Sequence, residues 1–147
     1  MADWTANLLE LDDDIRELVR AARRIAVLGI RPESRADRPA FYVPAYLAGV
    51  GLTILPVPVG NPGVSSILGQ PVHASVAEAP GPIDIVDVFR RAEDLPAHLP
   101  DLLAARPAAV WFQSGIRNDE VASELARHGI RVVQDRCLMV EHRRWAR

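Results

Sequence analysis

Five short apolar runs, separated by stretches with helical spacing, constrain the fold of this chain more than any other feature. The runs are rich in Ile, Val and Leu, and each has the length of one buried strand. They occupy residues 25–30, 52–57, 83–89, 108–112 and 130–134. Continuous apolar runs, rather than alternating ones, indicate strands of a parallel sheet that is covered on both faces.

The segments between these runs are expected to form helices. Asp12, Asp13 and Asp14 begin the first of them, because acidic residues favour a helix N-terminus. Pro39 suits the first position of the second helix. The predicted helices cover residues 12–23, 39–49, 92–106 and 118–128, with a short edge strand at 71–74 and a helical turn at 76–79. The alternation predicts one doubly wound α/β domain over residues 1–147, with five to six mostly parallel strands.

Both ends of the chain are expected to be short additions to this domain. Residues 1–24 carry the leading helix, and residues 138–147 form a C-terminal tail of one or two helical turns. The N-terminus is neither a basic nor an apolar signal sequence, so a cytoplasmic location is expected. The length of 147 residues is enough for a real core.

Charge and composition exclude several classes of protein. The net charge of -2 and the pI near 6.1 argue against a general nucleic-acid binder. No apolar run approaches the roughly 18 residues of a membrane span. Cys137 is the single cysteine, which excludes an internal disulfide and a cysteine-based zinc cluster.

All 17 basic residues are arginine, and the chain contains no lysine. This composition excludes the P-loop lysine and Schiff-base chemistry. Seven of the arginines follow the ends of predicted strands: Arg31, Arg35, Arg38, Arg90, Arg91, Arg117 and Arg136. Ligands of doubly wound sheets bind at the carboxyl ends of the strands, where helix N-termini also offer N–H groups. A site for a phosphate or pyrophosphate is therefore expected at this edge.

The loops at the same edge do not match a dinucleotide site. Gly29 follows the first strand, but no second or third glycine completes the G-x-G-x-x-G pattern. No Asp or Glu occurs from residue 38 to 77, so the usual acidic partner of the NAD ribose is missing. No arginine occurs from residue 39 to 89, so the usual partner of the NADP 2′-phosphate is missing as well.

Several motifs, in order along the chain, carry a family resemblance. They are Ala26–Gly29, Arg38–Pro39 with Tyr46–Leu47, Leu55–Val57, Ile83–Arg91, Val110–Ile116 and Asp135–His142. Over about residues 25–145, the chain closely resembles the small stand-alone CoA-binding proteins. These are related to the CoA-binding domain of the succinyl-CoA synthetase α subunit. The resemblance implies a Rossmann-like fold that binds coenzyme A (CoA) or an acyl-CoA, as a carrier, sensor or partner protein.

The resemblance also implies a set of binding residues. The residues expected to face the phosphates are Gly29, Ile30, Arg31 and Arg38. The adenosine side is expected to be lined by Val57, Pro58 and Asn61. The next loop is expected to be closed by Val88, Phe89, Arg90 and Arg91. Gln113 and Gly115 lie beyond that loop, and Ser34 and Arg136 complete the expected site. The loop between Gly29 and Arg38 is longer than the family's usual form.

Other readings of the sequence stay open beside CoA binding. A small enzyme on the same fold, either an NAD(P) oxidoreductase or a CoA-thioester transferase, is the alternative function. A partner enzyme or a homodimer is possible, with Trp4 and Trp145 as a dimer face. No nucleic acid, membrane or metal partner is expected.

Two further side chains invite specific expectations. Asp84 and Asp87 point to opposite faces of a strand, so they do not form a catalytic pair, and Asp87 is expected to form an ion pair with Arg90, Arg91 or Arg136. Cys137 follows the last strand and is expected either to pack in the core or to meet the CoA thiol. The four histidines are expected at the surface because their spacing fits no metal site.

Overall fold

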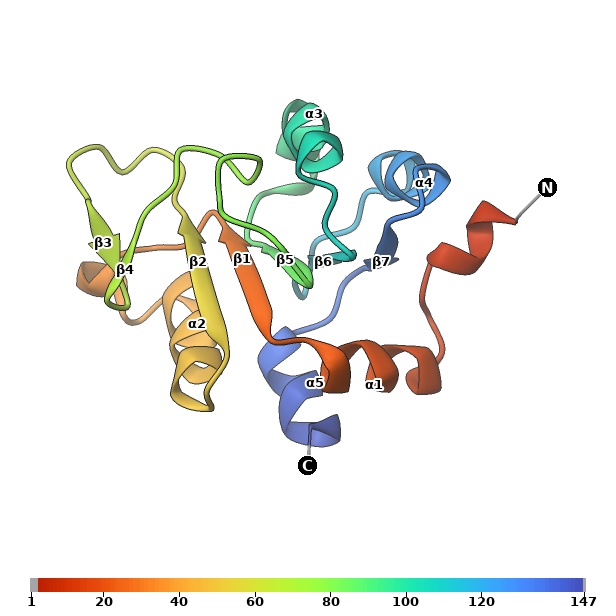
Figure 1. Ribbon diagram of the computed structural model, residues 1–147, viewed down its shortest axis with the longest axis horizontal. Coiled ribbons are helices and arrows are strands. Elements are labelled where there is room, and N and C mark those ends of the chain that lie inside the picture. Colours follow the sequence, from red (N-terminus) through yellow and green to blue (C-terminus); the bar gives the residue numbers. More distant parts are fainter. Residues whose placement is uncertain (1–2, 147) are drawn as a thin grey trace.

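The computed structural model describes residues 3–146 and is built around a parallel sheet of five strands (Figure 1). The strands are β1 (Arg24–Leu28), β2 (Thr53–Val57), β5 (Ile85–Val88), β6 (Ala109–Phe112) and β7 (Arg131–Val133). Their order across the sheet is β2-β1-β5-β6-β7. The sheet confirms the α/β fold expected from the five apolar runs.

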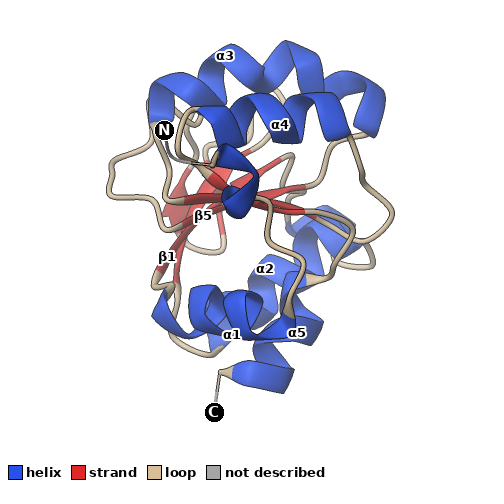
Figure 2. Ribbon diagram, turned by 90° about the vertical axis from the view of Figure 1, so that its right-hand side faces the viewer, coloured by secondary structure: helices blue, strands red, loops and turns tan. Residues whose placement is uncertain are grey.

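Helices cover both faces of the sheet (Figure 2). On one face lie α1 (Asp12–Ala21), α2 (Pro39–Gly49) and α5 (Leu138–Trp145), and on the other lie α3 (Leu95–Ala105) and α4 (Asp119–Arg127). Short 3-10 turns occur at η1 (Trp4–Asn7), η2 (Glu33–Arg35) and η3 (Ala92–Asp94). The C-terminal tail, expected to have one or two helical turns, forms two as α5.

Two hydrophobic cores form because side chains of a strand alternate between the faces of the sheet. In β1, Ile25 and Val27 pack under α1, α2 and α5, while Ala26 and Leu28 pack under α3 and α4. Trp111 and Phe112 in β6 are fully buried, one in each core. Burial on both sides explains why the strands appear in the sequence as continuous apolar runs.

The predicted edge strand at 71–74 is wrong. The connection from β2 to β5 instead carries a separate antiparallel hairpin, β3 (Ser66–Ile67) with β4 (Gln70–Pro71), outside the main sheet. Its strands are two residues each, and Leu68 and Gly69 both take positive φ values in the turn between them. Residues 76–79 form the expected turn, held by a hydrogen bond from the Ala79 N–H to the Val76 carbonyl.

The open edge of β7 is partly covered by the chain before α1. Leu9 donates its N–H to the Val132 carbonyl at 2.8 Å, and Leu8 forms an isolated bridge to Val132. Covering an edge strand in this way protects it from pairing with another chain. Among residues 3–146, none of the helices has both the length and the apolar character needed to cross a bilayer.

Candidate functional site

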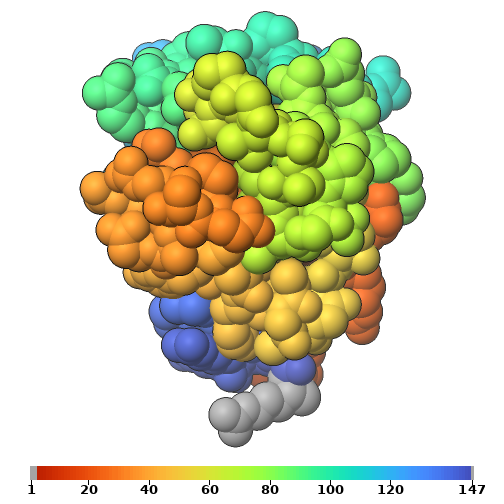
Figure 3. Space-filling model, turned by 90° about the vertical axis from the view of Figure 1, so that its left-hand side faces the viewer, coloured from red at the N-terminus to blue at the C-terminus, as the bar shows by residue number. Residues whose placement is uncertain are grey.

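The sheet has its switch point between β1 and β5, and the candidate site lies there. β1 leads into α2 on one face of the sheet, whereas β5 leads into α3 on the opposite face. The two connections therefore diverge at the carboxyl ends of neighbouring strands and leave a crevice between them, which is where doubly wound sheets bind ligands. On the face shown in Figure 3, the segment before α2 (orange) lies near the start of α3 (blue-green).

A pocket of about 540 Å³ occupies this crevice. Its lining consists of Arg31, Arg35, Arg38, Pro39, Ala40, Tyr42, Val43, Phe89, Arg90, Arg91, Gln113, Ser114, Ile116 and Cys137. The volume is within the usual range of small-molecule sites, about 300–1,000 Å³. Five of the lining residues are arginines, and none of those described is an aspartate, a glutamate or a histidine.

Gly29 allows the two connections to approach each other. Its φ is +87°, and a Cβ placed on it would lie 2.5 Å from the Phe89 carbonyl oxygen and 3.1 Å from the Arg90 Cδ. Any other residue would therefore be strained by its backbone angle and would also clash with the loop after β5. The glycine expected to face phosphate thus has a clear structural role, which is to bring Arg90 across the end of β1.

Arg90 and Arg91 meet the start of α3 through shared contacts. The Arg90 Nε donates to His98 Nε2 at 3.2 Å, and its Nη2 lies 3.6 Å from Asp94 Oδ2. The same Asp94 oxygen accepts from the Arg91 Nε at 3.2 Å, and Glu93 lies 3.5 Å from that nitrogen. Burial lowers the pKa of His98, and the charge of Arg90 lowers it further. A neutral His98 can accept the Arg90 hydrogen bond.

The N-terminus of α2 opens into the same pocket without a side-chain cap or an acidic residue in its first turn. Arg38 is the N-cap residue, no side chain caps the helix, and the first turn contains no acidic residue. Pro39 and Ala40, the first residues of the helix, line the pocket. The positive end of the helix dipole therefore adds to the arginine charges in favouring an anion there.

The structure brings together only part of the predicted site. Of the residues expected from the sequence, Arg31, Arg38, Phe89, Arg90, Arg91 and Gln113 line the pocket. Ile30, Val57 and Val88 are buried core residues, so their side chains do not line this pocket. Ser34 lies exposed in η2, and Pro58 and Asn61 lie in the loop after β2, where the Asn61 Nδ2 donates to the Val59 carbonyl. Gly115 neighbours the pocket and donates its N–H to Asp135.

Some residues of the pocket lining were not predicted from the sequence. Tyr42 and Val43 lie one helical turn after Arg38 and Pro39, so they share their face of α2. That helical spacing is the signal that could have found them. Ser114 and Ile116 flank the predicted Gly115 in the loop after β6. Cys137 is half-buried in the pocket wall, a position between the two expected for it.

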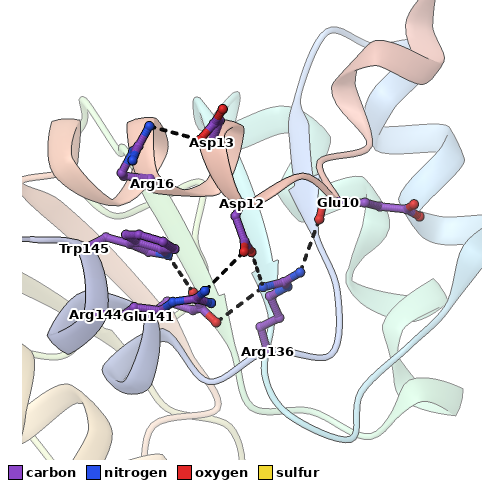
Figure 4. A network of polar contacts seen from close by, with 8 residues as sticks. All are labelled: Glu10, Asp12, Asp13, Arg16, Arg136, Glu141, Arg144 and Trp145. Atoms are coloured by element: carbon purple, nitrogen blue, oxygen red, sulfur yellow. Dashed lines mark hydrogen bonds and ion pairs between the residues drawn. The ribbon is translucent and has the colours of Figure 1, made fainter.

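Arg136 was predicted in the ligand site but belongs to a charged network at the other end of the sheet (Figure 4). Its Nη1 lies 3.4 Å from both Asp12 Oδ1 and Glu141 Oε1, and its Nη2 donates to the Glu10 carbonyl at 3.2 Å. Arg144 joins the network through Asp12 at 3.2 Å. Arg136 does not line the pocket because β7 is the far edge strand, and α1 places its acidic start beside it. Arg117, near the same edge, pairs with Asp119.

The expected ion pair of Asp87 is also wrong. Asp87 lies fully buried in β5, between Val27 of β1 and Trp111 of β6, and neither carboxyl oxygen has a hydrogen-bond partner. Burial raises the pKa of Asp87 well above its ordinary value. Arg90 instead turns toward α3, as its contacts with His98 and Asp94 show.

Asp84, the other acid of this segment, has a structural role. Its Oδ2 accepts hydrogen bonds from the backbone N–H groups of Arg23 and Arg24, both at 2.8 Å. It therefore fixes the entry of β1 next to β5. Of the histidines, His73, His98 and His142 are half-buried and only His128 is exposed. The Tyr46 hydroxyl lies 2.9 Å from His142 Nδ1.

Comparison with known proteins gives a consistent result. The model of a family described as a CoA-binding domain matches residues 23–143. The uncharacterized protein YneT of Bacillus subtilis is 36% identical over 129 residues, which cover 88% of this chain and 92% of that protein.

Solved structures resemble the chain as well. A Thermus thermophilus structure is 45% identical, with a TM-score of 0.83 and coverage of 92% of this chain and 99% of that one. A redesigned PH1109 protein is 30% identical, also with a TM-score of 0.83, over 94% of both chains. A dinucleotide-forming acetyl-coenzyme A synthetase from Candidatus Korarchaeum cryptofilum, in complex with phosphate and ADP, shares the fold alone. It is 17% identical, with a TM-score of 0.64 over 83% of this chain and 27% of that one.

Proposed function

Since the chain belongs to the family of CoA-binding domains, we propose that its arginine-lined pocket binds coenzyme A and that its function is binding rather than catalysis. The observation that carries the proposal is the convergence of five arginines and the uncapped N-terminus of α2 on one pocket at the switch point. That convergence implies a negatively charged ligand, as CoA is.

The charge of the pocket supports a polyanionic ligand. CoA carries a pyrophosphate and a 3′-phosphate, and guanidinium groups bind phosphate oxygens through paired hydrogen bonds. Arg31 and Arg35 form no ion pair within the described residues, and Arg38 has only an exposed contact of 3.8 Å with Asp37. These arginines are therefore available to an incoming phosphate.

The apolar part of the lining supports the remainder of the ligand. Tyr42, Phe89 and Ile116 contribute to the pocket wall, and such side chains pack against an adenine ring or a pantetheine chain. The proposal also assigns the adenosine side to the loop after β2, with Pro58 and Asn61. This loop carries no charged residue from Val57 to Gly63, which suits an uncharged base.

The chemistry of the lining supports binding over turnover. General acid–base catalysis needs a titratable group within hydrogen-bond reach of the reacting atoms. The described lining offers hydroxyls at Tyr42 and Ser114 and a thiol at Cys137, but no carboxylate or imidazole to activate any of them. We therefore propose a carrier, sensor or partner role, in which recognition of CoA is itself the function.

Native mass spectrometry of the purified protein and calorimetric titration with CoA test this proposal. We expect bound CoA or stoichiometric heat with CoA, weaker binding of dephospho-CoA, and no binding of NAD or NADP at the same concentration. Absence of heat with CoA would refute the proposal. Tighter binding of NADP, or turnover of any acyl-CoA in a panel, would replace it with the enzyme alternative.

A further inference from the structure

The side chain of Arg90 is held in one orientation by two residues of the segment that starts α3. We call Arg90, Asp94 and His98 the Arg90 clasp. The Arg90 Nε donates to His98 Nε2 at 3.2 Å, and its Nη2 lies 3.6 Å from Asp94. Its stem crosses Gly29, with Cδ 3.1 Å from the position of an added Cβ. Arg90 is consequently directed by contacts on two sides, unlike Arg31 and Arg35.

The partner of the Nε differs in kind from the partner of Nη2. Asp94 is an anion, and it also accepts from Arg91, so its charge is shared between two guanidinium groups. His98 is a neutral acceptor when it is unprotonated, and it orients Arg90 without cancelling the positive charge. Within the described residues, the Arg90 Nη1 has no protein partner, so a donor remains for a ligand in the pocket that Arg90 lines.

The surroundings of His98 favour its neutral form. The charged groups that act on the ring are Arg90 after β5, Asp94 in η3 and Asp101 in α3 itself. Burial is the largest influence and lowers the pKa of His98, Arg90 lowers it further, and the two carboxylates raise it in part. Because the lowering influences dominate, the imidazole is neutral at neutral pH and can accept the Nε hydrogen bond.

We propose that His98 is a positioning residue for CoA recognition: its neutral ring holds Arg90 across Gly29 toward the ligand phosphates, and its protonation releases Arg90 and weakens binding. The inference rests on the proposed CoA function and adds a residue outside the pocket lining to it. A protonated ring cannot accept the Nε hydrogen bond, and its charge repels the guanidinium. The predicted sign is thus unusual for a histidine near an anion site, because protonation lowers affinity.

Calorimetry with dephospho-CoA between pH 8 and pH 5.5 tests the role of His98. This ligand lacks the 3′-phosphate, which titrates near pH 6 and would obscure the profile. At pH 8 we expect His98→Gln, which keeps an acceptor, to bind like wild type, and His98→Leu to bind about fivefold more weakly. On acidification, wild-type binding should weaken about fivefold while His98→Gln stays nearly flat.

Two control measurements make the result decisive. Thermal melting confirms that each variant is folded, and Arg90→Ala sets the affinity of a protein without the clasped arginine. A ¹⁵N NMR signal of the Arg90 Nε should move as His98 titrates and should lose that movement in His98→Gln. Wild-type binding that strengthens on acidification, or a His98→Gln profile that follows wild type, would overturn the proposal. Absence of wild-type binding to both CoA and dephospho-CoA at pH 8 would instead refute the proposed CoA function, and this inference with it.

Discussion

Two regions of the molecule are rich in arginine, but they use it in opposite ways. At the junction of α1, α5 and the end of β7, Arg136 and Arg144 are closed onto Asp12 and Glu141 (Figure 4). At the switch-point pocket, four of the five lining arginines are exposed, and Arg31 and Arg35 form no ion pair within the described residues. The acids that contact the other three lie outside the pocket lining. Counting arginines alone therefore identifies neither region; the distribution of counter-charges does.

The helices that begin in the two regions show the same contrast. The first turn of α1 contains Asp12, Asp13 and Asp14, which satisfy its positive dipole end. The first turn of α2 contains no acid and has no side-chain cap. A helix whose first turn carries no negative group favours an external one at its N-terminus.

The pocket region also carries a stability cost, at a buried residue beneath the pocket. Asp87 is fully buried without a partner, two residues before Phe89 in the pocket wall. In the α1–α5 junction, by contrast, the nearly buried Glu141 accepts from the Trp145 indole and contacts Arg136. The pocket region is thus expected to be built for binding and the junction for stability, and substitutions should separate the two.

The largest effect is expected from removing charge at the pocket. Arg38→Ala and Arg90→Ala should each weaken CoA binding about tenfold, and the double variant about 100-fold, because each loses a charge-assisted hydrogen bond. Calorimetry measures the loss. The matched control is Arg144→Ala in the junction, which should change the CoA affinity less than twofold. An equal loss in the control would show that only the net charge matters and would break the contrast between the regions.

A smaller effect is expected at Asp87, where a substitution should stabilise the protein. Asp87→Asn should raise the free energy of unfolding by about 2 kcal/mol at pH 7. At this pH the Asp87 carboxyl ionises freely in the unfolded chain but not in the buried site, and an amide does not carry that cost. The pKa of Asp87 is raised in the folded protein, so its contribution is most favourable below the unfolded pKa near 3.9 and is lost as pH rises. The advantage of Asp87→Asn should therefore grow with pH, by up to about 1.4 kcal/mol for each pH unit.

Urea denaturation at pH 5 and pH 7 measures this effect. Asp84→Asn is the matched control in the same segment, and it should destabilise the protein because the Asp84 carboxylate accepts two backbone N–H groups. If Asp87→Asn were destabilised at both pH values, the carboxyl would have to be satisfied in solution. That result would remove the stability cost assigned to the pocket region.

The smallest of these effects is expected in the junction. Arg136→Ala should lower the free energy of unfolding by about 1.5 kcal/mol, because it leaves the Glu141 carboxylate with fewer partners and removes the link to Glu10. Its CoA affinity should match wild type. Arg117→Ala removes an exposed pair near the same edge, so it should change stability by no more than about 0.5 kcal/mol. A loss of CoA binding in Arg136→Ala would return Arg136 to the site in which the sequence placed it.

The sequence predicts the sheet well because burial on both faces leaves a direct trace in each strand. The five apolar runs correspond to β1, β2, β5, β6 and β7. Gly29 lies where the loop after β5 passes close to the end of β1. The hairpin of β3 and β4 could not be predicted in this way, since strands of two residues carry no periodicity.

The site is less predictable because the sequence of a single strand does not reveal its position in the strand order of the sheet. Arg90 and Arg136 both follow strands, yet one lies at the switch point and the other at the far edge. Asp87 has arginines nearby in sequence, but strand alternation turns it into the core under α2. Only the packing of α1 and α3 decides which arginine meets an acid and which one faces a ligand.

Hydrogen–deuterium exchange with and without CoA tests most directly whether the ligand binds at the switch point. We predict that CoA slows exchange in residues 29–43, 88–94 and 113–116, which line or flank the pocket, and leaves residues 8–12 and 138–145 of the junction unchanged. Protection confined to the junction, or spread evenly over the chain, would contradict the assignment of the CoA site to the pocket.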